Sequence, residues 1–239
     1  MNTAHEWTPG LWVRDLHAPL RLRDFKLIAF DMDSTLINIE CIDEIADAVG
    51  KKAEVAAITE AAMRGELSDY KDSLRRRVAL LKGVERRDLQ SVLDDRLRLN
   101  PGAVELLEAC HAAGLHTVLV SGGFTFFAQA VQQRLGIAFI RSNELEFHDD
   151  VLTGGLVSQA WGDICDGEEK RRTVIDQCQR VGCRLDQAIA VGDGSNDLPM
   201  MQACGVSVAF HAKPKVREHA KVCINQGGLD RLLEVVRPD

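Results

Sequence analysis

Two short acidic segments of this chain have the residue types and the spacing for chemistry on a charged substrate. In the first segment, Asp31 and Asp33 directly follow the apolar run at residues 27–30. Alternate residues of an extended chain point to the same side, so both carboxylates can face one site. Two acids so close repel each other unless a cation or a proton intervenes, or unless one is a nucleophile and the other an acid and base. An N-terminal helix cap that uses both acids is the structural alternative.

The second acidic segment, residues 192–197, holds Asp193, Asn196 and Asp197 among two glycines. Glycine permits a tight turn and a close approach of the backbone to a ligand. Aspartate and asparagine oxygens suit a hard cation, and magnesium commonly combines one or two carboxylates with phosphate oxygens. A calcium-binding loop is disfavoured because its twelfth position would be Cys204. An ordinary Asx turn remains the structural alternative.

Two weaker signals lie between the acidic segments. Ser121 and Gly122 follow the apolar residues 117–120, and glycines in this position can offer backbone N–H donors to an anion. Lys170 precedes a stretch with helical spacing, where a lysine is ordinarily exposed to solvent. Neither signal identifies a site by itself.

The elements that must position these segments alternate between strands and helices. Strand-length apolar runs occupy residues 27–30, 117–120, 137–140, 188–191 and 206–210. Stretches with helical spacing separate them, which is typical of a parallel sheet covered on both faces, so we predict a doubly wound α/β fold. Ligands of such folds bind at the carboxyl ends of the strands, where both acidic segments fall.

One interval interrupts this alternation and indicates a second structural unit. Residues 42–99 are rich in Ala, Glu, Arg and Leu at helical spacing, with a predicted turn at 63–69, and they predict a small inserted helical cap. We therefore expect an N-terminal extension at residues 1–25 and a catalytic core formed by residues 26–41 and 100–239.

Two local structures are predicted within the core. A helix should begin with Asn100 as its N-cap and Pro101 as its first residue, and Gly114 should follow its end. Alternating apolar and polar residues at 144–157 predict a β-hairpin.

Composition limits the classes of function that remain. The chain has 239 residues, is 46% hydrophobic and carries a formal net charge of -7, so it would repel nucleic acid. It contains no run of roughly 18 apolar residues that could span a membrane, and its first residues lack the apolar centre of a secretory signal. We expect a cytoplasmic protein with neither nucleic acid nor membrane as a partner. Its seven cysteines form no CxxC pair and are expected to be reduced packing residues.

Taken in chain order, the four segments resemble the motifs of the haloacid dehalogenase superfamily of phosphohydrolases. These motifs are a strand followed by DxDxT, a strand followed by Ser-Gly-Gly, a lysine, and a strand followed by GDGxND, and the resemblance extends from residue 27 to the end. Within the superfamily, the phosphoserine phosphatase family is the most similar. The segments that carry this likeness are residues 31–46, 120–124, 192–200 and 212–216.

The resemblance implies a magnesium-dependent hydrolase that releases L-serine and phosphate from O-phospho-L-serine, the last step of serine biosynthesis. Asp31 would form an aspartyl-phosphate, and Asp33 would act first as an acid and then as a base. Mg2+ would be held by Asp31, Asp193 and the backbone carbonyl of Asp33. The residues expected to contact or orient the phosphoryl group are Ser121, Gly122, Lys170, Asn196 and Asp197.

The resemblance also assigns residues to the amino-acid end of the substrate. Glu40 would face the ammonium group, and Arg77 would bind the carboxylate, for which the fork of an arginine is well suited. Met63 and Tyr70 would line the pocket, although the family usually has Phe where this chain has Tyr70. By composition alone, residues 75–77 would be charged residues on the solvent-exposed face of a helix.

Two other functions share parts of this pattern. A phosphotransferase would use the same aspartyl-phosphate to pass the phosphoryl group to another alcohol, such as homoserine. A non-catalytic phospho-receiver would also accept phosphate on an aspartate, but Asp33 is an acid and base that would hasten its loss. The expected partner is therefore the small molecule phosphoserine, and a homodimer is a candidate assembly.

Overall fold

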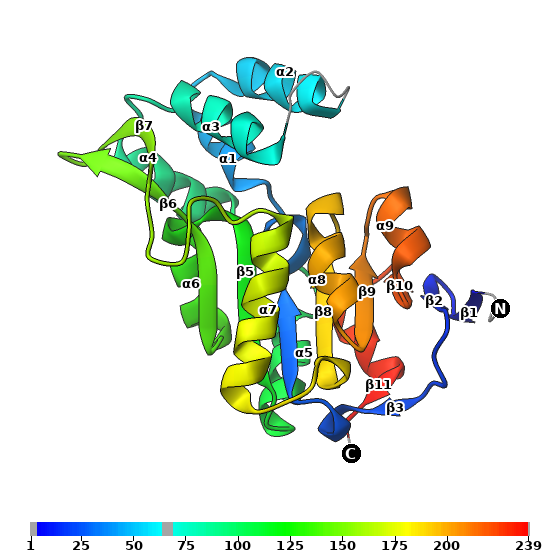
Figure 1. The fold of residues 1–239 in the computed structure, drawn as a ribbon. Coiled ribbons are helices and arrows are strands. Elements are labelled where there is room, and N and C mark those ends of the chain that lie inside the picture. Colours follow the sequence, from blue (N-terminus) through cyan, green and yellow to red (C-terminus); the bar gives the residue numbers. More distant parts are fainter. Residues whose placement is uncertain (1–3, 64–68, 239) are drawn as a thin grey trace.

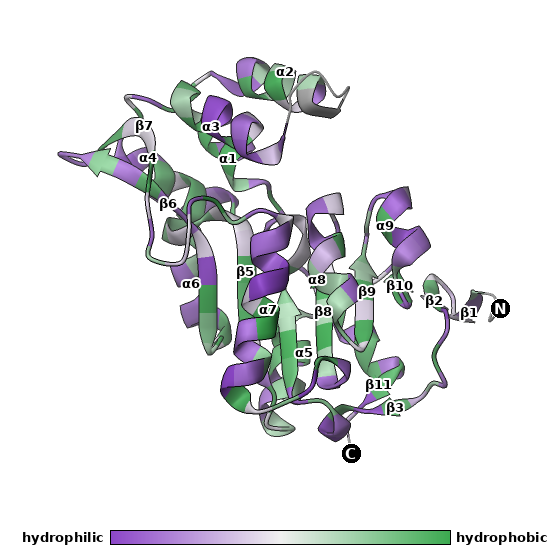
Figure 2. Ribbon diagram, in the orientation of Figure 1, coloured by the Kyte–Doolittle hydropathy of each residue, from purple (hydrophilic) through white to green (hydrophobic). Residues whose placement is uncertain are grey.

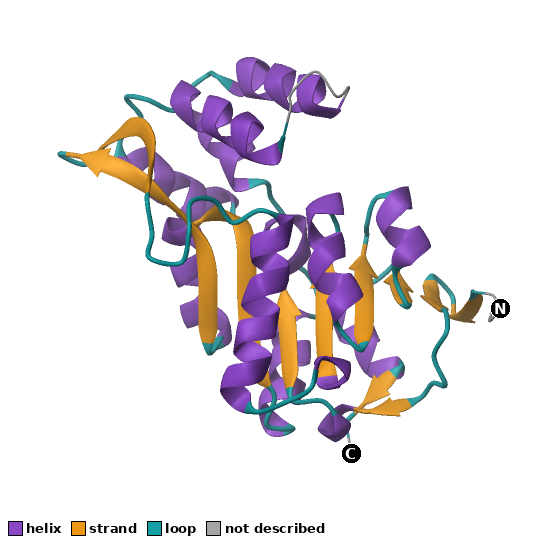
Figure 3. Ribbon diagram, in the orientation of Figure 1, coloured by secondary structure: helices purple, strands orange, loops and turns teal. Residues whose placement is uncertain are grey.

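The computed structural model describes residues 4–63 and 69–238, in which strands and helices alternate along most of the chain (Figure 1). The main sheet has the strand order β1-β2-β10-β9-β8-β4-β5-β6-β7. Helices lie on both faces of this sheet, as the secondary-structure colours of Figure 3 show. The predicted doubly wound α/β fold is confirmed.

The elements have the following bounds. The strands of the main sheet are β1 (His5–Thr8), β2 (Leu11–Val13), β4 (Leu27–Phe30), β5 (His116–Phe124), β6 (Phe139–His148), β7 (Val151–Val157), β8 (Ala188–Gly192), β9 (Val206–Phe210) and β10 (Val222–Ile224). A separate pair joins β3 (Leu20–Arg21) to β11 (Val236–Arg237). The helices are α1 (Cys41–Ala48), α2 (Lys52–Met63), α3 (Tyr70–Leu80), α4 (Arg86–Ser91), α5 (Ala103–Ala112), α6 (Thr125–Leu135), α7 (Gly167–Val181), α8 (Leu198–Ala203) and α9 (Pro214–His219).

Strand β4 is central to the sheet and is buried on both faces. Ile28 and Phe30 pack into the hydrophobic core on one face, whereas Leu27 and Ala29 pack into the core on the other. A strand covered by helices on both faces must be apolar at every position, which is why residues 27–30 form an unbroken apolar run. Figure 2 shows the hydrophobic colours gathered on the central strands.

The register of the central strands brings the candidate site segments to one edge. Strand β4 runs parallel to β8 on one side and β5 on the other, with Phe30 level with Val191 and Leu119. The residues that follow these three positions therefore emerge together at the carboxyl edge of the sheet. This edge is where a doubly wound fold binds its ligands.

The helix predicted to start at Asn100 begins later, so this prediction was wrong. Helix α5 begins at Ala103, and Gly102 before it has a φ of 77°, in the left-handed region that glycine favours. The side-chain amide of Asn100 donates to the carbonyls of Thr35 at 2.8 Å and Ile37 at 3.0 Å instead of capping a helix. Asn100 thus stabilises the turn that follows β4.

The strand predicted at 137–140 also begins later, at Phe139. The N–H of Ile137 donates to the carbonyl of Gln132 at 3.1 Å, which completes the end of α6 before the strand can start.

The predicted end of helix α5 was right, because Gly114 follows the helix with a φ of 75°.

The hairpin predicted at residues 144–157 is confirmed, since β6 and β7 pair antiparallel. Helices α1 to α4 follow β4 in the chain, and α1, α2 and α3 lie beyond the carboxyl edge of the sheet (Figure 1). The predicted helical segment 42–99 corresponds to this run, and its status as a separate cap domain stays a prediction. Of the turn predicted at 63–69, residues 64–68 lie outside the described residues.

Residues 5–13, expected only as part of an extension, add two strands to the main sheet. Strands β1 and β2 pair antiparallel, and Val13 of β2 lies opposite Val222 of β10. Leu11 and Val13 are buried while Trp12 between them is 36% exposed, as the alternation of side chains along a strand requires. Within residues 4–63 and 69–238, no helix combines the length and the apolar character of a membrane span.

Candidate active site

A cavity of about 690 Å³ opens at the carboxyl edge of the main sheet. Residues that follow β4 and β8, together with the last residues of β5, form its floor, and residues of α1, α2 and α3 form the opposite wall. The predicted site residues that line this cavity are Asp31, Asp33, Glu40, Tyr70, Arg77, Ser121, Gly122, Asp193 and Asn196.

Asp31 is fixed where β4 ends. Its backbone N–H donates to the carbonyl of Val191 at 3.0 Å, which extends the ladder between β4 and β8 by one bond. Its carboxylate Oδ1 accepts a hydrogen bond from the N–H of Met32 at 2.8 Å. The side chain is almost completely buried, so the sheet and the following turn hold this carboxylate in one orientation.

Lys170 joins two carboxylates beneath the cavity. Its Nζ lies 2.7 Å from Oδ1 of Asp31 and 2.7 Å from Oδ1 of Asp197. Lys170 lies in the first turn of α7, and its side chain is 0% exposed. A buried lysine without an anionic partner tends to lose its proton, so these contacts are what keep it charged. The interpretation of Lys170 as a solvated lysine is excluded.

The charges of this group do not balance, because two carboxylates share one ammonium. Burial and the charge of Asp197 raise the pKa of Asp31 well above its usual range, although Lys170 acts in the opposite direction. Burial alone would lower the pKa of Lys170, but Asp197 and Asp31 hold that pKa above its usual range. Lys170 is therefore a permanent cation, and the group still favours a further positive charge.

Asp197 organises the loop after β8. Its Oδ2 accepts hydrogen bonds from the N–H groups of Asp193 at 3.1 Å and Gly194 at 2.9 Å, while Oδ1 binds Lys170. A Cβ placed on Gly192 would lie 2.5 Å from the carboxylate carbon of Asp197, which explains why this position is glycine. Both oxygens of Asp197 are thus occupied within the protein, so it supports the site rather than facing the cavity.

Asp193 lies beside Asp31 and supplies a second carboxylate that could hold a cation, with Asp197 behind them. Oxygen atoms of Asp31, Asp193 and Asp197 all lie within 4.8 Å of one another. Burial, Asp197 and Glu40 raise the pKa of Asp193 to about 7, whereas Lys213 acts to lower it. Buried carboxylates with raised pKa values and an all-oxygen donor set fit a hard divalent cation.

Asp33 points to the start of helix α1. Its carboxylate accepts a hydrogen bond from the backbone N–H of Cys41 at 3.1 Å and one from the Cys41 thiol at 3.2 Å. The chain reaches this geometry through Ser34, which has a φ of 56° and whose hydroxyl donates to Glu40 at 2.7 Å. Burial and the charge of Glu40 raise the pKa of Asp33 to about 7, so it exchanges a proton near neutral pH.

The Ser-Gly-Gly segment is fixed by a residue of the neighbouring hairpin. Ser121 is buried, and its Oγ accepts a hydrogen bond from the N–H of Gly123 at 2.9 Å. The side-chain amide of Asn143 in β6 donates to the carbonyl of Gly122 at 2.8 Å and accepts from the N–H of Cys165 at 2.8 Å. The carbonyl of Gly122 is therefore turned away, toward Asn143.

Two side chains of α3, those of Tyr70 and Arg77, line the same cavity. A Cβ built on Gly122 would lie 2.0 Å from the hydroxyl of Tyr70, so the phenol lies directly against that backbone. Arg77 donates through Nε to the carbonyl of Ser73 at 3.4 Å, and its guanidinium forms no ion pair with any described carboxylate. The side chain of Met63, which was also predicted to line the pocket, lies outside the described part of the chain.

Sequence reasoning missed Cys41 and Asn143 as parts of the site. Cys41 was expected to be a packing residue, and Asn143 lies just before the predicted hairpin at 144–157 and was given no role. No local pattern distinguishes either residue, because each one acts through a hydrogen bond to a distant segment. Their positions follow from the fold.

The fold and the site define a class, the hydrolases that carry an acidic cluster at the carboxyl edge of a doubly wound sheet. A family model for haloacid dehalogenase-like hydrolases matches residues 28–202, and the chain belongs to this family.

Individual relatives are similar over nearly the whole chain. A phosphoserine phosphatase of Polaromonas sp. (strain JS666 / ATCC BAA-500) is 65% identical over 97% of this chain and 98% of its own length. A phosphoserine phosphatase of Albidiferax ferrireducens (strain ATCC BAA-621 / DSM 15236 / T118) is 64% identical over 96% of this chain and 97% of its own. A solved structure described as a phospho-aspartyl intermediate analogue of phosphoserine phosphatase has a TM-score of 0.81 and 35% identity, and it covers 89% of this chain and 99% of its own.

Proposed function

We propose that this chain is a phosphoserine phosphatase, which hydrolyses O-phospho-L-serine to L-serine and inorganic phosphate, the last step of serine biosynthesis. The observation that carries the proposal is that one cavity is lined by Asp31, which pairs with Lys170 beneath it, and by Glu40 and Arg77. The first pair suits transfer of a phosphoryl group, and the other two residues suit a zwitterionic amino acid. The relatives at 65% and 64% identity bear the name of this activity.

Asp31 is the nucleophile of the proposed reaction. Its Oδ1 accepts hydrogen bonds from Met32 and Lys170, which leaves Oδ2 for attack on phosphorus. The bond from Oδ2 to phosphorus forms as the bond from phosphorus to the seryl oxygen breaks, and the product is an aspartyl-phosphate. Lys170 offsets part of the negative charge that gathers around the phosphoryl group.

Asp33 moves the protons in both halves of the reaction. In the first half it gives its proton to the departing seryl oxygen, and in the second it accepts a proton from the water that attacks the aspartyl-phosphate. A group with a pKa of about 7 can serve both steps at neutral pH. The water oxygen ends on phosphorus, and Asp31 is regenerated.

Magnesium is the cation that we propose for Asp31, Asp193 and the backbone carbonyl of Asp33. The support is the cluster of buried carboxylates, whose charge exceeds that of Lys170. When bound, the ion supplies the positive charge that lets an anionic carboxylate meet an anionic phosphoryl group. Asp197 supports this set by orienting Lys170 and the backbone of Asp193.

The two ends of the substrate meet different walls of the cavity. Ser121, Gly122 and Asn196 take the phosphoryl oxygens, beside the end of β5 and the loop after β8. Glu40 takes the ammonium group and Arg77 the carboxylate, each by a charge-assisted hydrogen bond. Tyr70 and the helix that ends at Met63 close the pocket over the substrate.

Hydrolysis accounts for the site better than the alternatives. A phospho-receiver gains from a long-lived acyl phosphate, whereas Asp33 next to Asp31 promotes attack by water. Transfer to a second alcohol shares the aspartyl-phosphate with hydrolysis, and the names of the relatives do not favour it. Labelled phosphate on added homoserine would support transfer.

The test is release of inorganic phosphate from phosphoserine, phosphothreonine, a sugar phosphate and a nucleotide, each with magnesium and with excess chelator. We expect magnesium-dependent release mainly from phosphoserine, and none from the Asp31→Asn variant. Release mainly from another ester would keep Asp31 and Asp33 but overturn the roles of Glu40 and Arg77.

A homodimer stays a prediction. Light scattering tests it by measuring the molecular mass in solution.

A further inference from the structure

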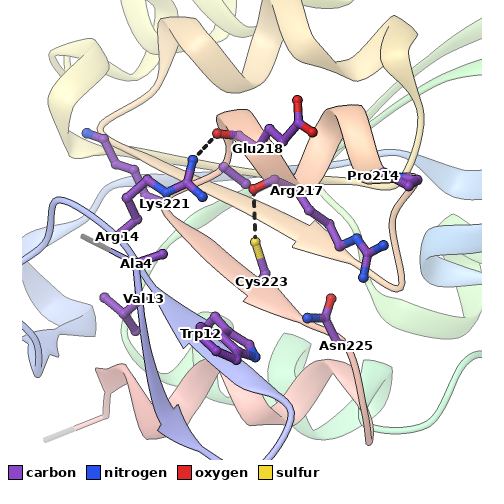
Figure 4. Close-up of a pocket in the computed structure, with 11 residues that line it drawn as sticks. Ala4, Trp12, Val13, Arg14, Pro214, Arg217, Glu218, Lys221, Cys223 and Asn225 are labelled. Carbon is purple, nitrogen blue, oxygen red and sulfur yellow. Dashed lines mark hydrogen bonds between the residues drawn. The ribbon is translucent and has the colours of Figure 1, made fainter. Parts of the chain in front are cut away.

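A second cavity, of about 300 Å³, lies between β2, α9 and β10 (Figure 4). It shares no lining residue with the catalytic cavity among the residues that the structure describes. Its volume reaches the range of roughly 300 to 1,000 Å³ that is typical of small-molecule sites. The cavity therefore has room for a ligand of its own.

Asn225 gives this cavity a buried acceptor. Its side-chain Oδ1 is shielded from solvent and accepts no hydrogen bond from the described residues. Buried polar atoms of native proteins nearly always have a partner, so an exception calls for an explanation. A ligand that donates an N–H or O–H group would satisfy this oxygen once the side-chain amide turns toward the cavity.

Arg217 gives the cavity a free donor. This side chain is half-buried, yet its guanidinium forms no hydrogen bond or ion pair with any residue that the structure describes. The two other cations on the wall are already in use: Arg14 donates to the carbonyl of Glu218, and Lys221 donates to the carbonyl of Gly205 at 2.7 Å. The planar fork of Arg217 is therefore the group best placed to bind a carboxylate or a phosphate.

The charge around this cavity is positive on balance. Arg14, Arg217 and Lys221 line it together with a single acid, Glu218. Figure 4 shows the Glu218 carboxylate turned away from Trp12. Arg217 and Asn225 lie to the right of Trp12 in this view. An anionic ligand would meet more attraction than repulsion there.

Trp12 supplies an apolar wall. It is 36% exposed, which makes it one of the few large apolar side chains on the surface of the described residues. Cys223 is buried beneath the cavity, and its thiol donates to the carbonyl of Arg217. The indole can cover the apolar body of a ligand while the polar groups opposite fix its orientation.

We propose that this cavity is a second binding site, for a small organic anion that carries a hydrogen-bond donor beside its anionic group and an apolar body behind it. Arg217 binds the carboxylate or phosphate, Asn225 accepts from the N–H or O–H group, and Trp12 packs on the apolar body. This site is separate from the substrate site, so the proposal does not depend on the proposed phosphatase activity.

Fluorescence of Trp12 provides a local readout. With Trp7 and Trp161 replaced by Phe, Trp12 is the sole tryptophan, and an additional Asp31→Asn change prevents turnover of phosphate esters. The carboxylate pair of probes is 3-phenyllactate, which has a hydroxyl, and 3-phenylpropionate, which lacks it. The phosphate pair is 2-hydroxy-3-phenylpropyl phosphate, which has a hydroxyl, and 3-phenylpropyl phosphate, which lacks it. These two arms distinguish the source of the anionic group.

We expect saturable fluorescence changes with the hydroxylated probe of at least one pair. This probe should bind with about tenfold higher affinity than the probe of the same pair that lacks the hydroxyl. Arg217→Ala should weaken this binding by about tenfold or more, and Asn225→Leu should abolish the preference for the hydroxyl. Arg180→Ala, on α7, is the matched control and should change neither the affinity nor the preference for the hydroxyl. Melting curves verify that each variant is folded. If Arg217→Ala does not fold, Arg217→Lys is used in its place.

Two results would overturn the proposal. One is the absence of any saturable change up to about 10 mM of all four probes. The other is equal binding by the unmodified protein and by folded Arg217 variants, which would show that Trp12 responds to an anion bound elsewhere.

Discussion

Cys41 donates two hydrogen bonds to one carboxylate, that of Asp33. The backbone N–H lies 3.1 Å from Oδ2, and the thiol lies 3.2 Å from Oδ1. Because Cys41 is the first residue of α1, the proposed acid and base is attached to the start of a helix that also borders the substrate cavity. The position of α1 and the orientation of Asp33 are therefore coupled.

Cys41→Ala removes the thiol donor and keeps the backbone donor. The thiol lowers the pKa of Asp33, so its loss should raise that pKa. Asp33 must carry a proton to assist the leaving oxygen, and we therefore expect the alkaline fall of kcat/KM to move to higher pH. A pH profile on phosphoserine measures the shift. Cys110→Ala, at a buried cysteine of α5, should leave the profile unchanged, and coincident profiles for both variants would count against the role of the thiol.

Lys170→Met should leave Asp31 and Asp197 buried without their shared cation. We expect kcat for phosphoserine to fall about 100-fold or more, because a fixed positive charge near the phosphoryl group is lost. The free energy of unfolding in chelator should fall by roughly 3–5 kcal/mol, the usual cost of breaking a buried ion pair. Urea unfolding and phosphate release measure the two effects. Lys215→Met, at an exposed residue of α9, is the control, and equal stability of the two variants would contradict the prediction.

Stabilisation by magnesium should depend on pH in a defined direction. Burial raises the pKa of Asp193 from 3.8 to about 7, so the folded state holds a proton there that the unfolded state releases. Without a cation, the stability that this proton contributes is complete below about pH 4 and is lost as the pH rises through about 7. Added Mg2+ should therefore raise Tm slightly near pH 5 and markedly near pH 8.

Thermal melts at these two pH values, with and without Mg2+, test this expectation. Asp193→Asn cannot ionise and should lose most of the gain at the higher pH. An equal rise of Tm at both pH values in the unmodified protein would show that the ion does not compete with a proton on this carboxylate.

Gly192→Ala should disrupt the loop after β8. The new Cβ would lie 2.5 Å from the Asp197 carboxylate, and Asp197 cannot withdraw without losing Lys170. We expect a loss of about 1–3 kcal/mol in the free energy of unfolding, together with lower activity. Gly155→Ala in β7 is the control, because its new Cβ would meet the ends of two side chains, Oε2 of Glu146 at 2.8 Å and Oγ1 of Thr153 at 3.3 Å, rather than a buried carboxylate held by a lysine. Similar stabilities for the two variants would refute the steric argument.

Arg77→Ala should change the choice of substrate more than the chemistry. If the guanidinium binds the substrate carboxylate, kcat/KM for phosphoserine should fall about tenfold or more. The value for phosphoethanolamine, which has no carboxylate, should stay nearly constant. Arg76→Ala is the control, because this exposed neighbour already pairs with Asp72. An equal loss on both substrates would remove Arg77 from carboxylate recognition.

The sequence predicts the central strands well and the edge strands poorly, for a physical reason. Residues 27–30 and 188–191 are buried on both faces and must be apolar throughout, which makes their pattern easy to recognise. Strands β1 and β2 have only four and three residues, and part of each faces solvent. They exist because β10 offers them a sheet edge, which no local pattern reveals.

The candidate site could be predicted only as far as its residues lie in recognisable motifs. Asp31, Asp33 and Asp193 follow apolar strands and could be inferred from type and position. The composition around Lys170 indicates an exposed lysine, and only the order of the motifs suggested otherwise. Contacts such as those of Cys41 and Asn143 link distant segments, so they required the fold.

The phenol of Tyr70 lies against Gly122, so helix α3 already touches the backbone that is proposed to receive the phosphoryl group. Phosphoserine must pass between a bulky aromatic ring and a residue that has no side chain. We expect each catalytic cycle to include a mechanical step, in which α3 lifts and returns, beside the chemical ones. The speed of such a gate depends on friction with the solvent, so turnover would slow in a viscous solution wherever the gate is slower than the bond chemistry.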